Sequence, residues 1–115
     1  MSDLAQGAVA AIGPLKWVLT AVLLMIALIS WAAGRGVIPV NGSVGLRIPP
    51  LQRSDAKWRA GHAAAVMPAL VAFAVSLLCS IVGLFVAAAA WGVVVAFVGG
   101  FVWTIVAAIR AANAA

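Results

Sequence analysis

The chain of 115 residues is too apolar for a water-soluble domain, because 67% of its residues are hydrophobic and only 8% are charged, whereas soluble domains carry roughly 25% charged residues. Seven Lys and Arg residues against two acids give a net charge of +5. These basic residues flank apolar segments, where lipid headgroups account for them, so the charge does not indicate nucleic-acid binding. The composition predicts an all-α integral membrane protein with one membrane domain, residues 1–115.

The first membrane span is expected after a short N-terminal tail. Residues 1–13 are small and weakly polar, which predicts a flexible segment. The span follows at about residues 16–33, with Trp17 and Trp31 near its two ends, as is typical of tryptophans at the membrane interface. Gly34 then ends the helix.

A polar connector, residues 34–62, follows the first span. It holds five of the seven Lys and Arg residues and the one histidine. Asn41-Gly42 is a turn dipeptide, and Pro49-Pro50 predicts an extended polyproline geometry. We therefore expect an ordered loop.

Two further spans are expected after the connector. Ser54 is a good N-cap for a helix that begins at the membrane surface and runs into a second span at about residues 63–85. The uncharged run that follows is too long for one span and predicts a third at about residues 89–109. Residues 87–90 contain no strong helix breaker, so the turn between these spans is poorly marked.

The distribution of Lys and Arg predicts the orientation, because basic residues concentrate on the cytoplasmic side of a membrane. The connector and the C-terminus are expected in the cytoplasm, and the N-terminus and the second turn outside. The residues counted on the cytoplasmic side are Arg35, Arg47, Arg53, Lys57, Arg59 and Arg110, against Lys16 on the other.

Small residues recur at four-residue spacing in the last two helices, and such rows let helix backbones approach closely in lipid. We interpret them as packing faces, with an Ala-rich composition as the alternative. In the third helix they are Ala88, Gly92, Ala96, Gly100, Thr104 and Ala108. In the second they are Ala60, Ala64, Pro68, Ala72, Ser76 and Ser80.

Few side chains are suited to catalysis. With two acids, one histidine, no tyrosine and the single Cys79 inside an apolar run, acid–base, nucleophilic and metal-assisted mechanisms all lack residues. The sequence therefore predicts neither an enzyme nor a metal or cofactor site. A haem held by two histidines of one chain is excluded, because only His62 exists.

The candidate site lies in the connector. Trp58 and His62 are four residues apart and share one face of a helix. We expect Arg47 to hold the loop against the start of that helix, by contacting its carbonyl groups or stacking on Trp58, and Asn41 to fix the turn that aims it. The alternative is structural: tryptophan and arginine often anchor a membrane interface, a lone histidine often makes a structural hydrogen bond, and Gly42 and Gly45 serve turns.

These residues resemble a known family. The run PVNGSVGLRIP, followed by SDAKWRAGHAAA, is similar to the signature of the SdpI-like family of small bacterial multi-spanning membrane proteins, and the likeness covers about residues 38–65. The resemblance implies a protein of the bacterial plasma membrane that gives immunity to, or senses, a membrane-active peptide. The matching residues are Asn41, Gly42, Gly45, Arg47, Trp58 and His62.

A second function remains open from the residues alone. A three-span protein with small-residue faces fits an accessory subunit of a larger respiratory or transport complex, with other membrane proteins as partners besides the lipid bilayer. A carrier or channel is weaker, because few ionisable residues fall within a span to mark an ion path.

Overall fold

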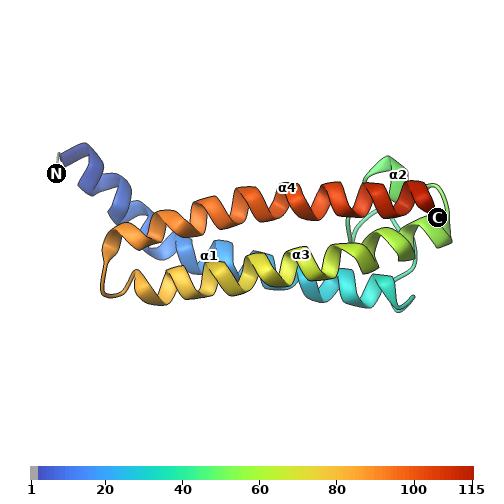
Figure 1. Ribbon diagram of the computed structural model, residues 1–115, viewed down its shortest axis with the longest axis horizontal. Coiled ribbons are helices and arrows are strands. Elements are labelled where there is room, and N and C mark those ends of the chain that lie inside the picture. The colour runs from blue at the N-terminus through green and yellow to red at the C-terminus, as the bar shows by residue number, and fades with distance from the viewer. Residues whose placement is uncertain (1–2) are drawn as a thin grey trace.

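Three long helices lie side by side in a narrow bundle of 51 × 22 × 20 Å (Figure 1). The structure is a computed structural model that describes residues 3–115, apart from the side chains of residues 3, 5, 6 and 8–12. In chain order the elements are α1 (Asp3–Gly34), α2 (Pro49–Gln52), α3 (Asp55–Val82), the 3-10 helix η1 (Ala87–Ala90) and α4 (Trp91–Ala114).

Each long helix contains a segment long and apolar enough to cross a membrane. These segments are Gly13–Gly34, Asp55–Val82 and Ala87–Ala114, and residues 3–115 contain no strand. The expected all-α class with three membrane-spanning helices is confirmed, and the chain is a multi-pass membrane protein. The C-terminus and α2 lie at one end of the bundle, and the α3–α4 turn lies at the other (Figure 1).

The middle of the bundle is α3, which packs along both other helices, while α1 and α4 touch each other little. Glycines set the close approaches. A Cβ on Gly34 of α1 would lie 2.9 Å from the Ala63 backbone nitrogen, and a Cβ on Gly100 of α4 would overlap the Ala72 side chain. Since the hydrophobic effect does not drive helix pairing in lipid, close backbone contact of this kind holds the three helices together.

The small-residue rows face the inside of the bundle over most of their length. Gly100, Thr104 and Ala108 of α4 are buried, and Gly92 and Ala96 are half-buried. Ala88 is exposed and lies in η1, before the beginning of α4. On α3 the row changes from half-buried to buried along the chain: Ala60 and Ala64 are half-buried, and Pro68, Ala72, Ser76 and Ser80 are buried.

Hydroxyl groups join α1 to α3 inside the apolar segment. The Thr20 Oγ1 donates to the Lys16 carbonyl at 2.7 Å and lies 2.6 Å from the Ser76 Oγ and 3.1 Å from the Ser80 Oγ. A hydroxyl has one hydrogen, so both serines donate to Thr20. Interhelical hydrogen bonds of this kind stabilise membrane proteins by about 0.6–2 kcal/mol each.

The prediction of a flexible N-terminal tail is wrong for residues 3–13, which form the beginning of α1. Residues 1 and 2 lie outside the described part of the chain. The segment is rich in alanine, the residue with the highest helix propensity. Pro14 lies inside the helix, where a proline removes one backbone hydrogen bond but is tolerated in apolar helices whose neighbours satisfy the freed carbonyl.

The turn between the last two helices comes earlier than expected. Helix α3 ends at Val82, and the Gly83 N–H donates to the Cys79 carbonyl at 2.8 Å. Gly83 has an ordinary helical φ of −62°, so backbone freedom does not explain the glycine. The space around it is tight, since an added Cβ would lie 3.1 Å from both the Lys16 Nζ and the Cys79 carbonyl oxygen. Because α3 ends at Val82, the predicted second span, residues 63–85, extends too far along the chain.

Gly100→Leu should lower the stability of the bundle by about 1–3 kcal/mol, because its side chain would enter the space filled by Ala72. Gly99→Leu is the matched control, since nothing lies within 4 Å of a Cβ at Gly99. Thermal unfolding of the detergent-purified variants measures the difference. Equal midpoints for the two variants would mean that the row of small residues does not set helix packing.

Candidate functional site

Asn41 organises the connector loop, residues 35–48. Its Nδ2 donates to the carbonyl groups of Pro39 at 2.7 Å and Val44 at 3.1 Å. Its Oδ1 accepts from the backbone N–H groups of Ser43 at 2.8 Å and Val44 at 2.6 Å. One amide side chain thus supplies four hydrogen bonds to the loop and fixes its turn, as its place in a turn dipeptide predicts.

Arg47 does not make the contact that the sequence led us to expect. Its Nη1 donates to the Gly42 carbonyl at 2.7 Å, and the side chain is exposed. The tight turn at Asn41 brings the Gly42 carbonyl back beside Arg47, so this acceptor inside the loop is reached instead of the carbonyls of α3 or the Trp58 ring. Arg47 therefore stabilises the loop through a hydrogen bond between two of its own residues.

The loop is attached to α3 through His62 and Trp58, both fully buried. The Leu46 N–H donates to the His62 Nε2 at 2.9 Å, so the ring hydrogen is on Nδ1, which donates to the Trp58 carbonyl at 2.7 Å. The Trp58 Nε1 donates to the Ile38 carbonyl at 2.9 Å. Both histidine nitrogens are therefore occupied, and no lone pair remains free for a ligand.

Gly45 lets the loop lie directly on these two rings. Its φ of +109° is in the region that favours glycine, and a Cβ would lie 2.8 Å from the Trp58 Cη2 and 3.0 Å from the His62 Nε2. Gly42 is different, since a Cβ there would meet nothing within 4 Å. Of the two glycines singled out in the connector, Gly45 is the one that the contact with α3 requires.

Helix α2 packs on α3 through Leu51, a contact that the sequence did not predict. The two prolines do not form an extended segment, because they begin α2, where the missing N–H and the fixed φ are compatible with a first turn. Leu51 is fully buried, and a Cβ on Gly61 of α3 would lie 2.5 Å from its Cγ. In the sequence, Leu51 directly after the two prolines and Gly61 near the beginning of α3 were the signals that could have predicted this contact.

Lys57 joins the beginning of α3 to the end of α4. Its Nζ donates to the Ala112 carbonyl at 2.9 Å and the Ala115 carbonyl at 3.0 Å. The last carbonyls of a helix have no partner within it, and a cation there also interacts favourably with the helix dipole. Spacing along the chain gave no sign of this contact, because it joins residues 55 positions apart.

The motif residues thus form a closed unit that fixes the connector to α3 and exposes no reactive group from His62 or Trp58. Within the described residues there is no group of three His, Cys, Asp or Glu side chains that could hold a metal ion. What the loop presents to the outside is a mixture of valines and arginines. These exposed residues are Arg35, Val37, Val40, Val44 and Arg47.

Comparison of the chain with models of protein families, with curated proteins and with solved structures found no match.

Gly45→Ala should release the loop from α3, because the new methyl group would both strain the backbone and overlap the Trp58 and His62 rings. Tryptic cleavage after Arg47, measured on the detergent-purified protein, should become at least several times faster. Gly42→Ala is the control and should leave the cleavage rate unchanged. If both variants are cleaved at the wild-type rate, the contact of Gly45 with the two rings does not hold the loop.

Proposed function

We propose that this chain is a non-enzymatic, SdpI-like protein of the bacterial plasma membrane that gives immunity to, or senses, a membrane-active peptide. The observation that carries the proposal is the meeting of the residues behind the family resemblance in one hydrogen-bonded unit. Asn41 fixes the turn of the loop, and Gly45 lets the loop lie on Trp58. His62 accepts a hydrogen bond from the Leu46 N–H of the loop. These residues therefore build a loop of fixed shape at one end of the bundle.

The exposed side of that loop fits a peptide that lies in the membrane surface. Such peptides place apolar side chains at the boundary between headgroups and acyl chains. Val37 is 71% exposed and Val44 is 41% exposed. Arg47 in the same loop and Arg53 after α2 are also exposed. Valines would contact the apolar face of the peptide, and the arginines would contact its carbonyl or carboxylate groups.

Protection against a membrane-active peptide tests this function. Bacteria that express the chain should survive higher concentrations of at least one peptide in a panel of secreted bacterial membrane-active peptides than cells carrying an empty vector. The protection should be lost in Gly45→Ala and retained in Gly42→Ala at equal protein levels in the membrane.

The competing function, an accessory subunit, predicts a different result. In that case the tagged protein, extracted from its native membrane, would co-purify with the subunits of one respiratory or transport complex in fixed proportion. Such a complex, together with equal peptide sensitivity of wild type and Gly45→Ala, would reject the immunity proposal.

We also propose that the connector and the C-terminus face the cytoplasm and that the N-terminus lies outside. Six of the seven Lys and Arg residues lie in the connector, residues 34–62, or near the end of α4, at Arg110, and these two parts lie at the same end of the bundle (Figure 1). Lys16 lies near Gly83, at the turn between α3 and α4. This asymmetry agrees with the tendency of basic residues to remain in the cytoplasm.

Reporter fusions test the orientation. A reporter that is active only in the cytoplasm should give a strong signal when fused after Gln52 or Ala115 and little signal when fused before Met1. A strong signal from the N-terminal fusion with none from the fusion at Gln52 would reverse the assignment.

A further inference from the structure

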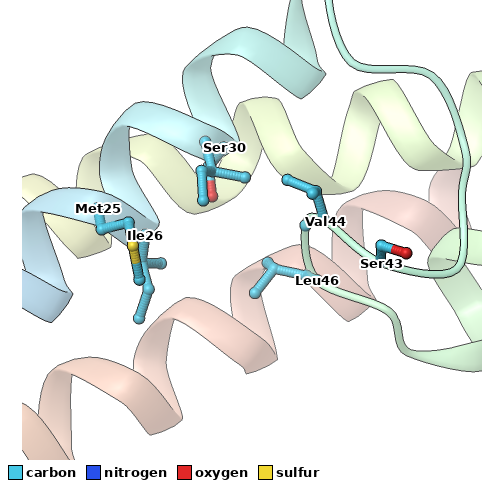
Figure 2. Close-up of a pocket in the computed structure, with 8 residues that line it drawn as sticks. Met25, Ile26, Ser30, Ser43, Val44 and Leu46 are labelled. Atoms are coloured by element: carbon cyan, nitrogen blue, oxygen red, sulfur yellow. The ribbon is translucent and has the colours of Figure 1, made fainter.

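A cavity of about 280 Å³ lies between α1 and the connector loop (Figure 2). Helix α1 contributes Met25, Ile26, Ile29 and Ser30, and the loop contributes residues 43–46. The lining is mostly apolar, and the volume is nearly twice that of the engineered cavity of about 150 Å³ that binds benzene in another protein. The cavity has room for several carbon atoms of a ligand.

One polar atom in this cavity has no partner. The Ser30 side chain is 1% exposed, and its Oγ is the one buried side-chain nitrogen or oxygen without a hydrogen bond among the described residues. The hydroxyls of Thr20 and Thr104 behave differently, since each donates to the carbonyl four residues earlier in its helix at 2.7 Å. Ser30 thus retains a donor for a molecule in the cavity.

The position of the cavity along α1 indicates which molecules can enter it. At 1.5 Å per residue, Ser30 lies about 6 Å and Met25 about 14 Å from the end of the membrane-spanning segment at Gly34. Both depths lie within a hydrocarbon core of about 30 Å, with Ser30 near its edge and Met25 deeper. Met25 is 52% exposed at the rim, so on this side the cavity is open to acyl chains of the bilayer.

The excess of basic over acidic residues in the connector favours an anionic lipid over a neutral one. The one acid of the connector, Asp55, is paired with Arg59 at 3.2 Å. Arg47 directly follows the lining residue Leu46 and uses Nη1 for the Gly42 carbonyl. A guanidinium has five N–H donors, so Arg47 keeps others for a phosphate group.

We propose that this cavity binds one acyl chain of an anionic glycerophospholipid. The Ser30 hydroxyl donates to the ester carbonyl of the chain, the hydrocarbon runs past Ile29 toward Met25, and the phosphate meets Arg47. A lipid fits all three observations, since it carries an ester carbonyl as acceptor, a hydrocarbon chain and a negative charge. This site does not depend on the proposed peptide function, although Val44 and Arg47 belong to both.

Native mass spectrometry of the detergent-purified protein tests the site, with dioleoyl phosphatidylglycerol and dioleoyl phosphatidylcholine as probes. Wild type should bind one phosphatidylglycerol molecule more tightly than phosphatidylcholine. Ile29→Trp should abolish this binding by filling the cavity, whereas Val18→Trp, at an exposed position of α1 that does not line the cavity, should preserve it. Arg47→Ala should remove the preference for phosphatidylglycerol.

Ser30→Ala keeps the test decisive if Ile29→Trp fails to fold, because it removes one oxygen atom that has no partner in the protein. It should weaken phosphatidylglycerol binding about five-fold, the loss expected for one hydrogen bond, without lowering the unfolding temperature. Equal binding by wild type, Ile29→Trp and Ser30→Ala would overturn the proposal. A co-purifying polypeptide in place of lipid, lost in Ile29→Trp, would also overturn it.

Discussion

Backbone groups that a loop buries against a helix bundle must find hydrogen-bond partners inside the protein, and this constraint acts where the connector packs on α3. The N–H groups of Ser43 and Val44 bind the Asn41 side chain, and the N–H of Leu46 binds His62. A loop can therefore fold back against α1 and α3 at the end of an apolar bundle while these N–H groups keep hydrogen-bond partners. The Asn41 and His62 side chains therefore act mainly as hydrogen-bond partners of the connector's backbone.

The same constraint explains why one glycine and two rings occur together. The loop reaches His62 only if its backbone passes over Trp58 at van der Waals distance, and Gly45 provides that passage. Trp58 in turn binds the Ile38 carbonyl near the beginning of the loop. The two ends of the loop are thus fastened to adjacent turns of α3, and the site's geometry follows from local contacts of a few residues.

The sequence predicted the fold well and the site in part, for reasons that particular residues illustrate. Long uncharged runs identify membrane helices directly, and Ser54 marked the beginning of α3, where its side chain accepts the Lys57 N–H. Asn41 acts locally, so its role was readable from a dipeptide. Arg47 and Leu51 were not, because their partners depend on how the loop folds back in three dimensions.

The central place of α3 also determines which changes would disturb the whole bundle. Thr20 joins α1 to Ser76 and Ser80 of α3, and Gly100 joins α4 to Ala72, one turn earlier in the same helix, whereas α1 and α4 share few contacts. A larger side chain in this part of α3 would therefore displace both neighbouring helices at once, whereas a change on α1 or α4 would disturb one pair of helices.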